Sequence, residues 1–341
     1  MKILVVDDSI VFRSAITQAL QKVPELNVFK SVVNGKLALD ILRLHPDVDL
    51  ITLDMEMPVM DGLETIKEIR KTNKDITIIV FSSLTVKGAE KTIEALNAGA
   101  DDFLAKPEGM ESIEGELVQK VLAFKDRKIK RSSIVEKKLT APLPSTNNDM
   151  PIKPKLILIG SSTGGPEALT TVFKSITEKV TIPMLLVQHM PPMFTEKLAT
   201  ALSKLSPVEV REAKSGDTLQ PGVCLIAPGD FHMTLSKDGI ISLNQGEKIC
   251  FVRPSVNVLL DSVAENFNKQ VLNIVMTGMG DDGAVGTKKV QEKGAYTYIQ
   301  DKESCIVWGM PGAVFKAIGD QARIIPLTQI GTLINTVSKR L

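Results

Sequence analysis

The chain is poor in several residue types, and each scarcity argues against a class of protein. Only three of its 341 residues are cysteines, and none stands in a C-x-x-C pair. This argues against a disulfide framework or a cysteine zinc site and favours reduced thiols. No apolar run approaches the roughly 18 residues that a membrane-spanning helix needs. Asp7-Asp8 interrupts the apolar start before it can act as a signal sequence.

Net charge is also nearly absent. The formal charge is +1, with 43% hydrophobic and 24% charged residues, and aromatic residues make up only 4%. This composition is typical of a soluble globular protein and supplies no general attraction to nucleic acid or to an anionic membrane. The length suits two domains, each with its own core. We therefore expect a two-domain cytoplasmic protein that binds no nucleic acid and inserts into no membrane.

Short apolar runs alternate with amphipathic segments over about residues 2–125. The predicted strands are Ile3–Val6, Asn27–Val32, Leu50–Leu53, Ile76–Phe81 and Asp102–Ala105, and the predicted helices lie near Val11–Lys22, Leu37–Arg43, Leu63–Arg70, Val86–Asn97 and Ser112–Lys125. This alternation predicts a doubly wound (βα)5 domain with a parallel sheet.

Polar residues follow these predicted strands directly. Asp7 and Asp8 follow the first strand, Asp54 the third, Ser82 the fourth and Lys106 the fifth. Ligands of such sheets bind outside the carboxyl ends of the strands. Carboxylates that converge there form a site for a hard cation such as Mg²⁺. Acidic strand ends are often merely solvated, but solvation does not explain a lysine and a hydroxyl at the same rim.

These residues belong to three motifs, which are Val5-Val6-Asp7-Asp8-Ser9, Leu53-Asp54-Met55-Glu56-Met57-Pro58-x-Met60-Asp61-Gly62 and Phe103-Leu104-Ala105-Lys106-Pro107. With them the segment resembles a response-regulator receiver domain, whose fold is flavodoxin-like. The resemblance implies that Asp54 accepts a phosphoryl group from a histidine kinase. It also implies Mg²⁺ binding by Asp7, Asp8, Asp54 and the backbone carbonyl of Glu56. Ser82 and Lys106 would contact the phosphoryl group.

The alternation of predicted strands and helices ends after the fifth predicted helix. Residues 140–149 have no periodicity and contain two prolines, which is typical of a linker. We predict a first domain at 1–125, a linker at 126–153 and a second domain at 154–341.

The second half again alternates strands and helices. The predicted strands are Leu156–Ile159, Pro183–His189, Val223–Ala227, Val271–Thr277, Ala295–Gln300 and one near Ile324, with helices at Phe194–Ser203, Ser255–Phe267, up to Lys293 and up to Ser338, and with a hairpin at Met233–Leu243. We expect a doubly wound, mainly parallel sheet with an antiparallel hairpin.

A glycine-rich turn follows the first of these strands. Gly160-x-Ser162-x-Gly164 is followed by Pro166, a residue that suits the first turn of a helix. This strand-turn-helix is expected to hold Ser162 above the sheet edge, as in the nucleophile elbow of serine hydrolases. Similar turns also occur without catalysis.

A catalytic serine needs a base, and the chain has only three histidines. His45 stands in the first domain, and His232 opens the hairpin, where a structural role is expected. His189 alone stands at the carboxyl end of a predicted parallel strand. The orienting carboxylate stays open at this point, because Asp281 and Asp282 follow one strand together. The two weaker candidates are Asp230 and Asp301.

Two other functions deserve comparison. Gly278-x-Gly280-x-x-Gly283, with Asp301 after the next strand, outlines a dinucleotide-binding fingerprint and hence a receiver-gated oxidoreductase. The carboxylates of Asp281 and Asp282 would repel a pyrophosphate in that turn. A receiver-linked transcriptional regulator is the other alternative, but the second half shows no compact helix-turn-helix and no basic recognition surface.

Four motifs stand in the order and spacing of one family, and they are Gly160–Gly165, Gln188–Thr195, Ala227–Asp230 and Thr277–Ala284. With them the whole chain resembles the chemotaxis protein-glutamate methylesterases, in which a receiver is joined to a serine esterase. The resemblance implies Ser162 as nucleophile, His189 as base and Asp282 as orienting acid. The backbone at Met279 and the neighbourhood of Thr163 would support the oxyanion.

The same resemblance implies an activity. It is hydrolysis of glutamate γ-methyl esters, and deamidation of particular glutamines, on methyl-accepting chemotaxis receptors during sensory adaptation. A chemotaxis histidine kinase would activate the enzyme by phosphorylation. Mg²⁺ would serve phosphorylation, and no cofactor is expected for ester hydrolysis.

Overall fold

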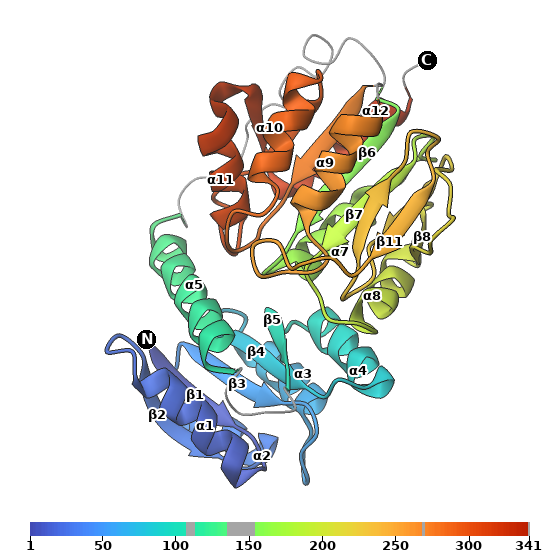
Figure 1. The fold of residues 1–341 in the computed structure, drawn as a ribbon. Coiled ribbons are helices and arrows are strands. Elements are labelled where there is room, and N and C mark those ends of the chain that lie inside the picture. The colour runs from blue at the N-terminus through green and yellow to red at the C-terminus, as the bar shows by residue number, and fades with distance from the viewer. Residues whose placement is uncertain (107–112, 135–153, 268–269, 340–341) are drawn as a thin grey trace. The chain divides into compact units, whose positions relative to one another are not determined.

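The computed structural model describes residues 1–106, 113–134, 154–267 and 270–339. The chain forms two compact units, Met1–Ile129 and Lys130–Leu341. Each unit is built around a parallel sheet (Figure 1). In the described part of the chain, no helix is both long enough and apolar enough to cross a bilayer.

The first unit alternates strands and helices throughout. Its elements are β1 (Lys2–Val6), α1 (Ile10–Gln21), β2 (Asn27–Val32), α2 (Gly35–Leu44), β3 (Leu50–Asp54), α3 (Gly62–Thr72), β4 (Thr77–Ser82), α4 (Val86–Asn97), β5 (Asp102–Ala105) and α5 (Ile113–Ile134). The sheet order is β2-β1-β3-β4-β5, with all neighbours parallel. The predicted (βα)5 fold is confirmed, and the strand order reverses between β1 and β3.

Side-chain caps fix where four helices of this unit begin. Ser9, Asn34, Asp61 and Thr85 each accept a hydrogen bond from a backbone N–H in the first turn of α1, α2, α3 and α4. Such caps satisfy N–H groups that a helix start leaves without partners. The caps therefore fix the points at which the loops after β1, β3 and β4 enter the next helix.

The end of the first unit differs from the prediction. Helix α5 continues to Ile134, beyond the range near Ser112–Lys125 that was predicted for it. The start of the predicted linker, 126–153, is therefore helical. Residues 135–153 lie outside the described residues.

The second unit has a larger sheet. Its elements are β6 (Leu156–Ser161), α7 (Gly165–Ser175), β7 (Met184–Gln188), α8 (Phe194–Ser203), β8 (Glu209–Glu212), β9 (Val223–Ile226), β10 (His232–Leu235), β11 (Ile241–Asn244), α9 (Val256–Asn266), β12 (Val271–Val275), α10 (Ala284–Glu292), β13 (Tyr296–Gln300), α11 (Gly309–Ile318), the 3₁₀ turn η2 (Gly319–Gln321), β14 (Ala322–Ile325) and α12 (Leu327–Ser338). The order β14-β13-β12-β6-β7-β9-β8 is parallel throughout, and β10 and β11 form a separate antiparallel hairpin.

The predicted architecture of this unit is confirmed, including the hairpin, whose turn holds Gly239 at φ +77°. Two elements were missed. Strand β8 lies at the sheet edge and is only four residues long, so it carries little periodicity. Helix α11 begins Gly309-Met310-Pro311-Gly312, a sequence that favours a turn, although proline is tolerated in a first helical turn.

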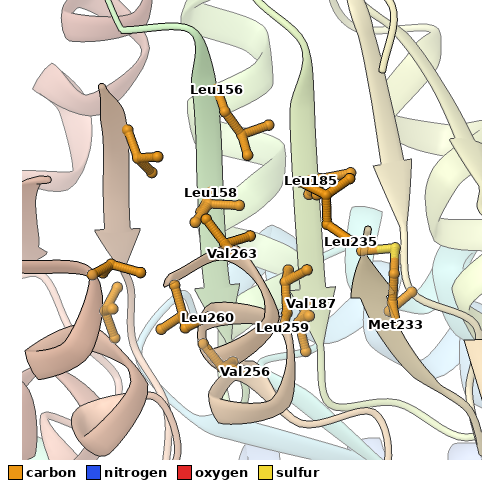
Figure 2. Packing of buried hydrophobic residues seen from close by; sticks show 14 of the residues in the cluster. Leu156, Leu158, Leu185, Val187, Met233, Leu235, Val256, Leu259, Leu260 and Val263 are labelled. Atoms are coloured by element: carbon orange, nitrogen blue, oxygen red, sulfur yellow. The ribbon is translucent and has the colours of Figure 1, made fainter. Parts of the chain in front are cut away.

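Strand β6 holds the central place in the second sheet, between β12 and β7. Its residues Leu156 to Ser161 are all buried, as expected for a strand covered on both faces. Leu156 and Leu158 share a buried cluster with Leu260 and Val263 of α9 (Figure 2). Since the strand order reverses between β6 and β12, the carboxyl ends of these strands form the switch point where doubly wound sheets bind ligands.

Helix α9 reaches this switch point with its N-terminus. A Cβ at Gly160, near the end of β6, would lie 2.9 Å from the methyl groups of Val256. A Cβ at Gly283 would lie 3.0 Å from the same side chain, and Gly283 also has φ +92°. Both glycines therefore allow the start of α9 to pack closely against the end of β6 and the start of α10.

Candidate functional sites

The carboxyl edge of the first sheet gathers two buried carboxylates and one half-buried lysine. Asp7 follows β1, Asp54 ends β3, and their side chains are almost wholly buried. The Nζ of Lys106, which follows β5, lies 2.7 Å from Asp54 Oδ2 and 3.3 Å from Asp7 Oδ2. One ammonium group thus forms ion pairs with two buried carboxylates, so the cluster keeps an excess of negative charge.

The proton affinities of these groups reflect that excess. Burial raises the pKa of Asp54, and Lys106 and the N–H of Glu56 offset this only in part. Burial and the charge of Asp54 raise the pKa of Asp7. Burial alone would lower the pKa of Lys106, but its hydrogen bond and charge interactions with both aspartates raise it above the usual value. The lysine therefore stays charged at neutral pH.

The same edge fits a hard divalent cation. Carboxylate oxygens of Asp7, Asp8 and Asp54 all lie within 4.8 Å of one another, and Asp8 is exposed. An oxygen-only, anionic donor set is what Mg²⁺ prefers. The N–H of Glu56 donates to Asp54 Oδ1 at 3.2 Å, so this main chain lies beside the aspartate. Metal binding by the Glu56 carbonyl stays a prediction.

Ser82 ends β4, which lies between β3 and β5. Its hydroxyl donates a 3.0 Å hydrogen bond to the carbonyl oxygen of Gly88 in α4. The structure thus places Ser82 at the predicted edge and joins it to α4.

Ser162 stands on the turn between β6 and α7. Its N–H donates to the carbonyl of Thr277 at 3.0 Å, and its carbonyl accepts from the N–H of Gly165 at 2.7 Å. Gly164 has φ +72°, a conformation that favours glycine. A Cβ at Gly278 would lie 2.9 Å from the Cβ of Ser162. The serine turn is therefore packed directly against the segment that follows β12.

His189 stands at the end of the neighbouring strand, β7. Its N–H donates to the carbonyl of Ser161 at 3.1 Å, which continues the β6–β7 pairing. The imidazole Nε2 lies 2.8 Å from Asp282 Oδ2. Nδ1 is thus the nitrogen left for a serine hydroxyl. Among the described residues the Ser162 hydroxyl has no hydrogen-bond partner, and such bonds often form only when substrate is present.

Asp282 is buried beside the N-terminus of α9. Its carboxylate accepts from the Ser255 hydroxyl at 2.8 Å, the N–H of Val256 at 2.6 Å and the N–H of Asn257 at 3.0 Å. Burial by itself raises the pKa of Asp282, but His189 and these donors outweigh burial and hold the pKa below its usual value. The carboxylate therefore stays ionised and can orient the imidazole.

The other candidate carboxylates lie elsewhere. Asp281 is exposed, Asp230 pairs with Arg253 at 2.6 Å, and Asp301 accepts from the Ser304 hydroxyl. The structure places Asp282, among these four, in hydrogen-bond contact with His189.

The other two histidines have structural surroundings. His232 is buried, and its Nδ1 accepts from the N–H of Ser255 at 3.2 Å. Its Nε2 lies 2.9 Å from the carbonyl oxygen of Glu247, so this nitrogen carries a hydrogen. His45 ends helix α2, with its ring centroid 4.6 Å from that of Phe29. Among the hydrogen bonds of the described residues, none joins either histidine to Ser162.

The predicted oxyanion groups flank the serine turn. Thr163 is buried, and its carbonyl accepts from the Thr277 hydroxyl at 3.0 Å. The N–H groups of Thr163 and Met279 donate to none of the residues that the structure describes. Their free N–H groups are compatible with oxyanion binding, which stays a prediction.

Two of the three glycines of the dinucleotide-like turn have packing roles. A Cβ at Gly278 would overlap Met310 Sδ, and Gly283 is pressed against Val256. Asp282, inside the same turn, directs its charge to the α9 N-terminus. Close packing therefore accounts for Gly278 and Gly283, and a backbone φ of +80° accounts for Gly280, without a bound phosphate.

Sequence reasoning missed two residues of this site. The sequence places Ser255 only at the start of a predicted helix, whereas in the structure its hydroxyl caps α9 and donates to Asp282. Gln188 was read only as part of a motif, yet its buried amide bonds to the serine turn. A polar residue at the end of an otherwise apolar strand was the available signal for Gln188.

Comparison with known proteins gives a consistent picture. The CheB methylesterase family matches residues 157–334, and the response regulator receiver domain matches residues 3–118. A protein-glutamate methylesterase/protein-glutamine glutaminase of Sulfurimonas denitrificans is 41% identical over 353 residues, which cover 98% of this chain and 97% of that protein. A relative of the same name from Nocardioides sp. is 38% identical, with 97% of this chain and 93% of the relative covered.

A solved structure agrees for the second unit. The crystal structure of the Thermotoga maritima CheB methylesterase catalytic domain is 38% identical, with a TM-score of 0.50, and the match covers 54% of this chain and all of that one. The chain therefore belongs to the CheB methylesterase family, and its N-terminal unit is a response regulator receiver domain.

Proposed function

We propose that this protein hydrolyses γ-methyl esters of glutamate, and deamidates particular glutamines, on methyl-accepting chemotaxis receptors. The observation that carries the proposal is the His189–Asp282 contact of 2.8 Å beside the turn that bears Ser162. A buried imidazole-carboxylate pair next to a serine elbow suits acyl transfer. The names of the relatives supply the substrate class. Removal of receptor methyl groups would serve sensory adaptation.

The proposed reaction begins with attack of the Ser162 oxygen on the ester carbonyl. His189 Nδ1 takes the hydroxyl proton, while Asp282 holds Nε2–H and stabilises the imidazolium. The N–H groups of Thr163 and Met279 receive the oxyanion. The tetrahedral intermediate collapses to an acyl-enzyme, and methanol leaves with the proton from His189.

Hydrolysis of the acyl-enzyme completes the cycle. Water gives a proton to His189 as its oxygen bonds to the acyl carbon. The bond between the acyl carbon and the Ser162 oxygen then breaks, His189 returns the proton to that oxygen, and the glutamate side chain leaves as a carboxylate. Deamidation follows the same steps with ammonia as the leaving group. Asp282 keeps its charge throughout, because four hydrogen-bond donors surround its carboxylate.

Asp54 is the proposed phosphoryl acceptor, and a chemotaxis histidine kinase is the proposed donor. Bound Mg²⁺, held by Asp7, Asp8, Asp54 and the Glu56 carbonyl, would neutralise charge on the transferring group. Lys106 would pair with the phosphoryl oxygens, as it now does with Asp54. The Ser82 hydroxyl would exchange its bond to Gly88 for one to the phosphoryl group. Phosphorylation would raise esterase activity, and the cytoplasm is the proposed place of action.

Methanol release from methylated receptor membranes tests the proposal. The intact chain should release methanol, and a small phosphodonor should increase the rate. Ser162→Ala should lose at least about 10³-fold in rate, whereas Ser236→Ala, a half-buried hairpin serine of the same unit, should retain the wild-type rate. Asp54→Asn should keep the basal rate and lose the increase. Full activity of Ser162→Ala would remove this serine from the mechanism.

A further inference from the structure

Gln188, the last residue of β7, uses its amide fully at the serine turn. The residue is 1% exposed. Its Oε1 accepts from the Ser161 hydroxyl at 2.6 Å, and its Nε2 donates to the carbonyls of Ser162 at 3.0 Å and His189 at 3.1 Å. Because both partners of Nε2 are carbonyl oxygens, chemistry fixes the orientation of the amide.

These bonds continue the sheet where its backbone pairing stops. The β6–β7 register ends with Ser161 opposite Gln188, and the last backbone bond joins the N–H of His189 to the carbonyl of Ser161. Ser162 and His189 stand beyond that point on separate strands. The single amide of Gln188 bonds to the main chain of both, so it ties the proposed nucleophile to the proposed base.

Gly165, the first residue of α7, leaves the space that this amide fills. A Cβ at Gly165 would overlap Oε1 of Gln188 and would lie 3.1 Å from its Nε2. The N–H of Gly165 also donates to the Ser162 carbonyl at 2.7 Å. The Ser162 carbonyl therefore accepts two hydrogen bonds, one from the glycine and one from the glutamine. A side chain at position 165 would displace the amide from that carbonyl.

We propose that Gln188 is a positioning residue that sets the distance between Ser162 and His189, and that Gly165 gives it room. The inference rests on the proposed esterase function. Gln188 touches none of the reacting atoms, and it acts through the backbone of its two neighbours. Misplacement of a reacting group by about 1 Å costs on the order of 10²-fold in rate. Substrate binding does not depend on the distance between Ser162 and His189 to this degree, so kcat should decrease and KM should not change.

The principal test compares Gln188→Met with Asn273→Leu in the full chain. Asn273 is an equally buried amide on β12, and it bonds to Thr287 on α10. Both variants lose a buried amide, so both should unfold at a lower temperature. We expect only Gln188→Met to lose about 10²-fold in kcat for methanol release, with KM unchanged. Equal kcat losses in the two variants, or wild-type kcat in Gln188→Met, would overturn the proposal.

Labelling of Ser162 by a fluorophosphonate gives a second measurement that needs no receptor. The maximal labelling rate should fall in Gln188→Met, and the half-saturating probe concentration should not change. Gly165→Ala should reproduce the defect. The double variant should be hardly slower than either single variant, since both remove the same bond. Additive losses would contradict the shared mechanism.

Two further comparisons keep the outcome clear. If Gln188→Met does not fold, Gln188→Glu and Gly165→Ala take its place. Each should show the same loss in kcat, and wild-type kcat in these variants would overturn the proposal. Glu keeps the acceptor for Ser161 but sets a second oxygen against the carbonyls of Ser162 and His189. Failure of the proposed function is separate, because it would leave Ser162→Ala active. Failure of this inference would leave Ser162→Ala inactive and Gln188→Met fully active.

Discussion

The two units place reactive groups at equivalent points of their sheets but treat buried charge in opposite ways. In the receiver, Asp7 and Asp54 share one lysine, and the pKa of each is raised. In the esterase unit, Asp282 has four donors of its own, and its pKa is lowered. The first arrangement keeps uncompensated negative charge, which a cation can relieve. The second holds one carboxylate in a fixed, ionised state.

This difference shows how one topology supports two chemistries. Both sheets reverse their strand order, between β1 and β3 and between β6 and β12, and both sites stand at that reversal. The topology supplies a crevice and the residues after each strand supply the reaction. Four changes test the comparison, given from the largest expected effect to the smallest.

Asp282→Asn should have the largest effect. An amide in place of the carboxylate would hold the wrong imidazole tautomer, and such a change costs about 10⁴-fold in kcat in serine proteases. We expect a loss on the order of 10³- to 10⁴-fold in methanol release, with phosphoryl uptake by Asp54 unchanged. Asp281→Asn, at the exposed neighbour, is the control and should stay near the wild-type rate. Equal losses in both variants would contradict the assignment.

Lys106→Met should destabilise the receiver. It leaves two buried carboxylates without their cation, and breaking a buried pair costs about 3 kcal/mol or more. Because the Lys106 side chain is 24% exposed, we expect about 2 kcal/mol, measured by urea unfolding. Lys2→Met breaks the more exposed pair with Asp47, which solvent screens, so this variant should lose much less stability than Lys106→Met. A smaller loss for Lys106→Met than for Lys2→Met would refute the charge argument.

Ser255→Ala should affect stability and rate together. It removes the cap of α9 and a donor to Asp282. Loss of such a cap costs about 1 kcal/mol, and we expect kcat to fall severalfold as the carboxylate loosens. Asn34→Ala removes the cap of α2 in the receiver and should cost similar stability with no change in basal kcat. Thermal unfolding and basal methanol release measure the two effects. An unchanged kcat in Ser255→Ala would contradict a role of the Ser255 hydroxyl in catalysis and leave it only the role of a helix cap.

The smallest expected effect is a change in folding stability at acidic pH. The pKa of Asp282 lies below its ordinary 3.8 in the folded chain, so its carboxylate stabilises the fold above that value. The contribution is lost as the pH falls through the folded-state pKa. The stability advantage of wild type over Asp282→Asn should therefore shrink below about pH 4.

Asp7 should show the opposite sign. Its pKa is raised in the folded chain, so its carboxylate destabilises the receiver above that pKa, and the penalty fades as the pH falls toward 3.8. With a chelator present, Asp7→Asn should be more stable than wild type at neutral pH, and the gain should vanish in acid. Thermal unfolding across pH measures both differences. If both Asp→Asn substitutions changed the stability in the same direction at neutral pH, the contrast between the two units would be contradicted.

The sequence predicts the edge of each sheet well. A residue directly after a buried parallel strand must stand at its carboxyl end, and this rule predicts the places of Asp54, Lys106 and His189. The glycine-rich turn predicts the place of Ser162. Strand alternation likewise predicted both sheets. Short or glycine-rich elements such as β8 and α11 escaped, because they carry too few residues or too many turn formers.

Contacts between distant elements were beyond such reasoning. Asp281 and Asp282 are neighbours, and only the fold shows that Asp282 turns inward to α9. That approach depends on Gly160 and Gly283, which make room for Val256. The bond between Gln188 and Ser162 depends in the same way on the register of β6 with β7. Local sequence carries no record of such packing.

The most direct test of the account is to map, by peptide mass spectrometry, where a fluorophosphonate modifies the intact protein. The account predicts one modified residue, Ser162, with labelling lost in His189→Ala and retained in Asp54→Asn. Modification of a different residue, or undiminished labelling of Ser162 without His189, would contradict the claim that these two side chains act together.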